Sequence, residues 1–344
     1  MPTALLKITA ALALLALASP ALFAAEPHPN RVVWEGDAGP GQGKQIVFIA
    51  GDHEYRGEET LPALARILAK EYGFKCSVCF TTDPADGTIK PGSNHITGLE
   101  ALKTADLMVL FTRFQAFDDE QMQHIDDYLA SGKPVIGLRT STHAFNGLKG
   151  KFAHYNEGYD GDQQEWQGGF GEAILGEHWV GHYGRNHQQS SRLLLEPRQR
   201  KHPILRGVNN VHVQCGGYNA HPREGSTILA RGQILNGMQP TAEPDETKEI
   251  LPVVWVRQYQ ADNPKSRVFA TTHGASEDIL NPGFRRLLIN AHLWCLGLDE
   301  AIAPDNPIAF IGPYHPTTFN FDGHRQGVKP SGLAGWEAAI LGGE

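Results

Sequence analysis

Three short segments of the chain carry side chains whose types and spacing suit acid–base chemistry. They are Gly51–Arg56, Arg139–His143 and Thr272–Asp278. Imidazoles and carboxylates exchange protons near neutral pH, and a guanidinium can polarise a substrate oxygen. We therefore expect general acid–base catalysis. The expected catalytic residues are Glu54 or His143 as the base and His182 or His273 as the acid.

A second set of side chains is expected to bind the substrate. It consists of His53, Arg139, Ser141, Trp179, His187 and Glu277. Simpler interpretations remain open for several of them. His53 and Glu54 could cap the following helix, because its dipole favours acids at its start. Arg139 could pair with Glu277 or Asp278 instead of holding a substrate oxygen.

Each of the three segments follows a run of apolar residues that is typical of a buried strand. The expected strands lie at 45–50, 74–80, 107–111, 134–138, 253–256 and 267–271. Helices with one apolar face are expected between them, around residues 61–68, 118–131 and 284–295. This alternation predicts an α/β fold with three layers, a flavodoxin-like or Rossmann-like parallel sheet covered on both faces. Ligands bind at the carboxyl edge of such a sheet, so the three segments should converge there.

Four parts are expected along the chain. Residues 1–24 resemble a secretory signal peptide, with an early cation, a Leu/Ala-rich run and small residues at its end, and predict export to the periplasm or beyond the cell. Residues 25–44 form a lead-in, and residues 45–298 form the α/β domain, with a loop-rich insertion from about 150 to 250. Residues 299–344 are rich in Pro and Gly and predict an irregular tail.

Composition limits the expected partners. The formal net charge is −8 and basic residues do not cluster beyond residues 198–201, so nucleic acid is not an expected partner. After the signal peptide, the apolar runs fall short of the ~20 residues that a membrane span needs. A small-molecule carbohydrate is the expected ligand. The oligomeric state is left open.

Cysteine chemistry is not expected at the site. The chain has four cysteines, and none lies in the three segments. Cys76 and Cys79 are spaced as C-x-x-C, but in a strand their side chains point to opposite faces, so we interpret them as buried cysteines rather than a redox or metal pair. Ser141 lacks the G-x-S-x-G surroundings of a nucleophilic serine, which favours a plain turn hydroxyl.

A separate histidine cluster predicts a candidate metal site. It consists of His178, His182 and His187. In a helix the first two would share one face, as metal-binding pairs do, although Gly181 and Gly184 weaken a helical interpretation. A divalent transition metal is therefore the candidate cofactor, with none assigned as certain. The alternative is that these histidines form hydrogen bonds in a sugar pocket, where Trp179 stacks on the sugar.

Three segments together resemble the ThuA-like, or trehalose-utilisation, family. They are residues 132–145, 170–182 and 267–294, and the resemblance runs from about residue 45 to 297. It implies a class I glutamine-amidotransferase-like α/β fold and an association with sugar metabolism. Amidotransferases of that class use a cysteine at the turn where this chain has Arg139. They also have a His-x-Glu pair late in the chain, which His273 and Glu277 resemble at a wider spacing. Glutamine hydrolysis is therefore not expected.

The functional expectation is an exported ThuA-like protein that hydrolyses or isomerises a carbohydrate or an oxidised sugar derivative, for which a keto-sugar is one candidate. Two alternatives remain. One is a sugar-binding protein that does not catalyse, and the other is a metal-dependent hydrolase that uses the histidine cluster.

Overall fold

The computed structural model describes Met1 and residues 29–341. Apart from Met1, the predicted signal peptide lies outside the described residues, and so do residues 342–344. Among the described residues, none of the helices has both the length and the apolar character needed to span a bilayer.

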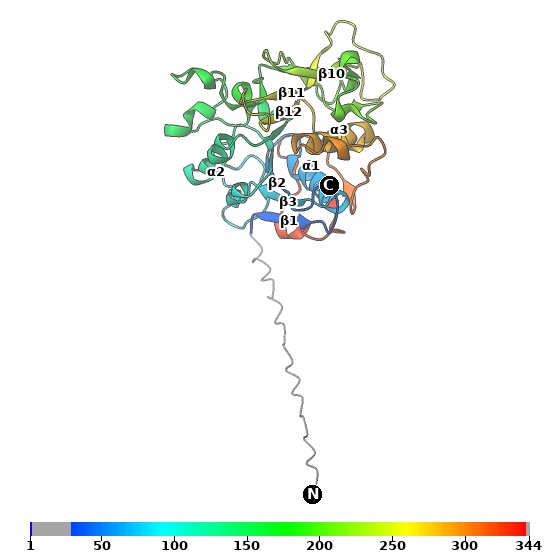
Figure 1. Ribbon diagram of the computed structural model, residues 1–344. Helices are drawn as coiled ribbons and strands as arrows, with labels where there is room; N and C mark the ends of the chain where they lie inside the picture. Colours follow the sequence, from blue (N-terminus) through cyan, green and yellow to red (C-terminus); the bar gives the residue numbers. More distant parts are fainter. Residues whose placement is uncertain (2–28, 342–344) are drawn as a thin grey trace.

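A ten-stranded sheet forms the middle of the molecule (Figure 1). The strand order is β1-β3-β2-β4-β5-β12-β11-β10-β7-β8. In this order the strands are Arg31–Glu35, Lys75–Phe80, Gln45–Gly51, Leu107–Thr112, Val135–Leu138, Arg267–Thr271, Leu251–Gln258, Thr227–Ile234, Ser191–Leu195 and His212–Val213. Neighbours among β3, β2, β4, β5 and β12 pair in parallel, so the predicted parallel α/β sheet is confirmed. The flavodoxin-like order of these five strands places the first of them, β2, between the next two.

The remaining strands differ from the expectation of a wholly parallel sheet. β1 pairs antiparallel with β3, and β11, β10, β7 and β8 extend the other edge in antiparallel pairings. Antiparallel neighbours do not need a helical crossover. The loop-rich insertion can therefore contribute β7, β8 and β10 to the main sheet while it remains poor in helix.

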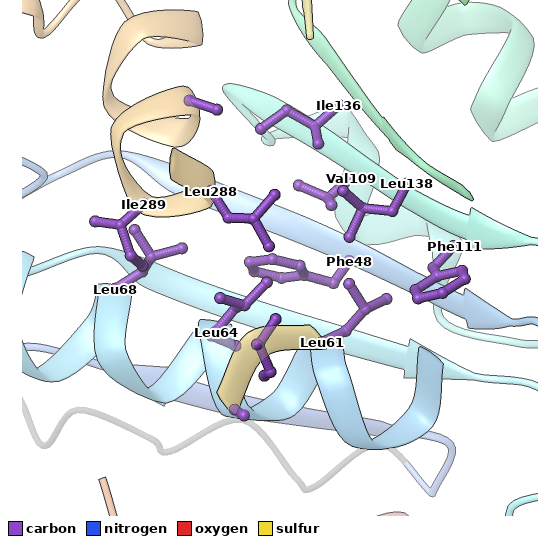
Figure 2. Close-up of a cluster of buried hydrophobic side chains, with 14 of the residues drawn as sticks. Phe48, Leu61, Leu64, Leu68, Val109, Phe111, Ile136, Leu138, Leu288 and Ile289 are labelled. Atoms are coloured by element: carbon purple, nitrogen blue, oxygen red, sulfur yellow. The ribbon is translucent and has the colours of Figure 1, made fainter. Parts of the chain in front are cut away.

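Helices cover both faces of the parallel strands. α1 (Gly57–Tyr72) and α3 (Pro282–Cys295) pack on one face, and α2 (Asp119–Ala130) packs on the other. The strand side chains alternate accordingly, since Phe48 of β2 faces α1 and α3 whereas Ile49 belongs to the core beneath α2. Figure 2 shows Phe48 among leucines of both α1 and α3. The predicted apolar faces of all three helices are confirmed.

Helix boundaries follow local sequence signals. The Asp118 side chain accepts a hydrogen bond from the Gln121 backbone N–H at 2.9 Å, which is the predicted start of α2. Asn281 caps α3 in the same way through Phe284 N–H. Gly132, at φ 69°, follows α2 in a left-handed conformation that favours glycine.

The predicted strand cysteines also lie as expected. Cys76 and Cys79 are both in β3, both buried and both free, and they belong to the cores on opposite faces of the sheet.

Beyond α3 the chain stays in contact with the body of the protein. Its described part, residues 299–341, contains the short 3₁₀ helices η9 (Asp299–Ala301) and η10 (Pro330–Leu333) and the strands β13 (Tyr314–His315) and β14 (Ile340–Leu341). Arg66 of α1 donates hydrogen bonds to the carbonyls of Leu333 and Ala338 at 2.8 and 2.6 Å. The tail is therefore irregular but packed.

The core around Phe48 yields a stability prediction. Phe48 is 0% exposed, so Phe48→Ala should lower the free energy of unfolding by roughly 3–5 kcal/mol through lost burial and the cavity left behind. Urea unfolding followed by circular dichroism measures this loss. The control is Leu280→Ala, at a side chain that is 48% exposed, which should change the free energy by less than about 0.5 kcal/mol. Equal losses in the two variants would contradict the packing described here.

Candidate active site

The strand order places a binding position between β2 and β4. The connection after β2 leads to α1 on one face of the sheet, and the connection after β4 leads to α2 on the other. In open α/β sheets, ligands bind at the carboxyl ends of two neighbouring strands whose connections diverge in this way. The loop after β2 carries His53 and Glu54, as predicted. The loop after β4 carries Arg113 and Phe114, which sequence reasoning missed. Their position directly after a predicted strand was the available signal.

The β2 loop is folded by the buried carboxylate of Asp52. Its Oδ2 accepts hydrogen bonds from the backbone N–H of Glu54, at 3.2 Å, and of Tyr55. Burial raises the pKa of Asp52 to about 6, opposed by the hydrogen bond from Tyr55. α1 then starts after Arg56, whose φ is 63°, without a hydrogen bond from a capping side chain. The capping role considered for His53 and Glu54 is therefore not realised.

Arg113 joins the two loops. Its Nη1 donates to His53 Nε2 at 2.8 Å, and its Nη2 lies 3.8 Å from Glu54 Oε2. Burial, and then the charge of Arg113, lowers the pKa of His53. Glu54 Oε2 is buried and lacks a hydrogen-bond partner among the described residues. The cluster thus holds a neutral imidazole beside a carboxylate oxygen that lacks a hydrogen-bond partner in the described part of the chain.

Arg139 occupies the turn after β5. It is fully buried and has a φ of 40°. Its Nη1 donates to the carbonyls of Gly216, at 2.8 Å, and Thr272, at 2.7 Å, and lies 3.2 Å from Cys215 Sγ. Cys215 Sγ in turn donates to Asp278 Oδ2, so Arg139 is linked to that carboxylate through the thiol. Within residues 29–341, the direct pairing considered with Glu277 or Asp278 is not found. Full burial also leaves it beneath the surface on which a substrate would lie.

Two aromatic rings enclose the Arg139 guanidinium. The Cζ atom lies 3.7 Å from the ring centroid of Tyr55 and 4.8 Å from that of Tyr218. Such contacts stabilise a buried cation. Ser141, two residues on, donates its hydroxyl to the Leu110 carbonyl at 2.8 Å. The interpretation of Ser141 as a plain turn hydroxyl agrees with this bond.

His143 lies inside an aromatic group. Its ring centroid is 4.9 Å from Phe114, 5.1 Å from Trp179 and 5.8 Å from Tyr218. Burial, followed by the charges of Arg113 and Arg139, holds the pKa of His143 well below its usual value. The imidazole is therefore neutral near pH 7, as a proton acceptor must be.

His182 comes to the same group from strand β6 (His182–Tyr183). Its Nε2 lies 3.0 Å from the Tyr55 hydroxyl, which also receives a hydrogen bond from Asn186 Nδ2 at 2.8 Å. The ring lies 5.6 Å from those of Trp179 and Tyr218. Burial, and then Arg139, lowers the pKa of His182, although the residue remains exposed to solvent. Like Arg113 and Phe114, Tyr55 is a site residue that sequence reasoning missed.

His273 lies behind the site rather than on it. It is 0% exposed, and its Nδ1 is 3.3 Å from Cys215 Sγ. The Cys215 thiol donates to Asp278 Oδ2 at 2.9 Å. Cys215 lies outside the three predicted segments, but the insertion carries it next to Arg139, behind the site. The expected acid role of His273 would require access that this burial does not give.

The three histidines predicted to bind a metal have separate partners. His178 Nδ1 pairs with Glu172 Oε2 at 3.1 Å, His182 faces Tyr55, and His187 stacks on Phe319 at 4.4 Å. The predicted triad is therefore not assembled. The irregular backbone around Gly181 and Gly184, both at positive φ, turns the imidazoles apart.

Two other groups of side chains in the described residues could hold a metal ion, with ligand atoms within 4.8 Å of one another. They are Cys215, His273 and Asp278, and Glu172, Glu177 and His178. In the first group the Arg139 guanidinium lies 3.2 Å from the sulfur, and its charge opposes a cation there. The second group is partly exposed, and there a cation would compete with Arg223, 3.9 Å from Glu172, and with the proton of Glu177, whose pKa burial raises to about 7.

Strained backbone collects at this edge of the sheet. Among the described residues, the non-glycine residues with positive φ are Arg56, Phe114, Arg139, His187, Asn210 and Asp322. Three of them lie in the loops after β2, β4 and β5. Such conformations cost roughly 1–3 kcal/mol each and gather at functional sites.

Comparison with known proteins agrees with this architecture. The family model described as ThuA, trehalose utilisation, matches residues 45–295. The chain belongs to the ThuA family. A search of curated proteins finds no significant match.

Solved structures include ThuA-like proteins from two bacteria. The chain shares 13% identity with the one from Bacteroides uniformis ATCC 8492, at a TM-score of 0.45, covering 78% of this chain and 98% of that one. For the one from Parabacteroides merdae ATCC 43184 the identity is 14%, the TM-score 0.43, and the coverage 81% and 97%.

Asp52 yields a prediction about pH. Its pKa is raised in the folded protein, from 3.8 to about 6, so folding favours the protonated form. The free energy of unfolding should therefore fall, relative to that of Asp52→Asn, as the pH rises from about 4 to about 7, by up to ~3 kcal/mol. Urea unfolding at several pH values measures the difference. Asp305→Asn, at an exposed position, is the control, and parallel curves for wild type and Asp52→Asn would contradict the buried carboxyl.

Proposed function

We propose that this ThuA-family protein catalyses proton transfer on a carbohydrate that carries a carbonyl group, and so isomerises a keto-sugar. The family description, trehalose utilisation, supports the substrate class. The observation that carries the proposal is the buried Glu54 Oε2, which lacks a hydrogen-bond partner among the described residues and lies 3.8 Å from Arg113. Hydrolysis of a keto-sugar is a further reaction that the same groups could serve.

The proposed chemistry balances without a co-reactant. Glu54 removes a proton from the carbon beside the carbonyl, the C–H electron pair forms a carbon–carbon double bond, and the carbonyl oxygen becomes an enolate. A neutral imidazole, His182 in this proposal, protonates the enolate oxygen. The imidazolate of His182 then takes the proton from the hydroxyl on the carbon that lost its hydrogen, and Glu54 returns its proton to the former carbonyl carbon. The carbonyl has moved to the neighbouring carbon, and both side chains are restored.

The rate enhancement expected from these groups favours this reaction over direct cleavage of a glycoside. A positioned acid or base contributes roughly 10²–10⁴-fold, which suits a C–H bond already acidified by a carbonyl. Glycoside hydrolysis needs two carboxyl groups facing each other across the bond. Of the two carboxylates in the β2 loop, Asp52 is occupied by backbone N–H groups, which leaves Glu54.

Each neighbouring group has a part in the proposal. Arg113 and His53 hold substrate oxygens beside Glu54, and Trp179 borders the site near His182. Tyr55 fixes the His182 ring at 3.0 Å. Export by a cleaved signal peptide remains part of the proposal.

Glu54→Gln tests the proposed base. With 2-keto-D-glucose in D₂O, we expect wild type to exchange the C3 proton, and the variant to lose at least ~100-fold in that rate because the amide cannot accept the proton. Proton NMR follows the exchange, and circular dichroism checks the fold. The control is Glu246→Gln, which neutralises an exposed carboxylate in the insertion.

Other outcomes would favour the alternatives. Sugar binding by wild type without exchange would favour a binding protein. Retained exchange in Glu54→Gln would exclude Glu54 as the base.

A metal-dependent hydrolase is the second candidate, favoured by the group Glu172, Glu177 and His178. The hydrogen bonds of this group run to one another and to the His221 backbone, not to Glu54. We therefore expect exchange to survive both EDTA treatment and His178→Ala within about two-fold, because acid–base groups alone carry the reaction. Metal analysis by mass spectrometry accompanies the assay. A stoichiometric metal that is lost together with the rate would instead favour metal-assisted hydrolysis.

A further inference from the structure

The C-terminal tail reaches the candidate site although it lies beyond the family match, which ends at residue 295. Thr317 is anchored to α1, since its N–H and hydroxyl donate to the two oxygens of Glu59 at 2.8 and 2.6 Å. Its carbonyl accepts from the Ser276 hydroxyl at 2.7 Å. A few residues on, the Arg56 guanidinium donates to the Asn320 carbonyl. These bonds fix the backbone beside the β2 loop.

The anchored segment places two aromatic rings against site residues. Phe319 is buried, stacked on His187 at 4.4 Å and 5.0 Å from the Tyr55 ring. Phe321 lies 5.2 Å from the His53 ring and 4.9 Å from the Arg113 guanidinium. Phe319 therefore serves packing, whereas Phe321 borders the groups that surround Glu54.

Phe321 is unusual in its exposure. Its side chain is 48% exposed. The other large apolar side chains that are exposed in the described residues are aliphatic. A single exposed apolar side chain is ordinary on a protein surface. Here, however, the backbone is held before the ring by Arg56 and is strained after it, at Asp322 with φ 57°. The ring is therefore presented in a defined position rather than left on a loose loop.

The charges around Phe321 indicate what it can accept. Arg113 lies 4.9 Å from the Phe321 ring, and Glu54 lies 3.8 Å from Arg113, so the formal charges of this pair balance. His53 is neutral near pH 7 because burial and Arg113 lower its pKa. A balanced pair offers little net attraction to an anion but several hydrogen-bonding atoms. An aromatic face beside such atoms matches a ring with an apolar C–H face and hydroxyls at its edge.

We propose that Phe321 and Arg113 form a subsite for the ring of a neutral sugar, with Phe321 against its C–H face and Arg113 and His53 on its oxygens. This inference rests on the proposed function and specifies its substrate class. It makes the tail a determinant of specificity: the tail supplies the binding surface, and the sheet loops supply the proton-transfer groups.

The test compares Phe321→Ala, Phe321→Trp and Leu280→Ala with wild type in the exchange assay with 2-keto-D-glucose. Loss of the aromatic face should raise KM by about 10-fold and leave kcat within about two-fold, because the ring binds the sugar without moving a proton. Phe321→Trp should restore KM, and Leu280→Ala should leave it unchanged. An unchanged KM in Phe321→Ala, or an equal rise in Leu280→Ala, would overturn the subsite.

Calorimetric binding separates this inference from the proposed function. Trehalose and 2-keto-D-glucose are titrated into wild type, Phe321→Ala and Glu54→Gln. Weaker binding in Phe321→Ala alone supports the subsite even if wild type shows no exchange. The subsite is overturned if neither sugar binds wild type. It is also overturned if D-gluconate binds more tightly than both sugars, because a balanced charge at Arg113 and Glu54 should not favour an anion. Thermal unfolding confirms that the variants fold.

Discussion

The buried charge of Arg139 is the constraint on which the carboxyl edge of the sheet depends. A guanidinium without solvent must find acceptors, because an unpaired buried charge costs several kcal/mol. The Nη1 atom of Arg139 finds them in the carbonyls of Gly216 and Thr272, 77 and 133 residues away in the sequence. Rings from Tyr55 and Tyr218 close over it. The insertion and the loops after β2, β5 and β12 are thus held by one side chain.

The charge of Arg139 also affects the protonation of the histidines around it. Together with burial, Arg139 favours the neutral forms of His143, His182 and His273. Arg113 acts likewise on His53, while it lies beside Glu54. A cation beside an imidazole disfavours its protonated form. Two arginines, Arg113 and Arg139, thus favour neutral imidazoles at this edge of the sheet.

Sequence patterns were sufficient to predict the fold and the site residues wherever a periodic signal or the end of a strand determined the geometry. The strands before Asp52 and Arg139 are continuous apolar runs, so the convergence of their loops followed from parallel topology. Arg113 could have been found by the same argument applied to β4. Cys215 and Phe321 could not have been found in this way. Cys215 lies in an insertion without periodicity, and Phe321 lies in an irregular tail. Their positions are set by tertiary contacts, which a single sequence does not encode locally.

The antiparallel half of the sheet explains why the insertion and the tail can meet at the site. β7, β8 and β10 anchor the insertion to the sheet, and the loop that leaves β6 brings His187, at φ 63°, over the carboxyl edge. There His187 stacks on Phe319 of the tail at an interplanar angle of 25°. Each irregular segment thus supplies a ring that buries part of the other. Because both are also held by residues of the β2 loop, Tyr55 and Arg56, the sheet fixes how these two segments face Glu54. A rigid surround of this kind is what positioned proton transfer requires, since misplacement by about 1 Å can cost as much as 100-fold in rate.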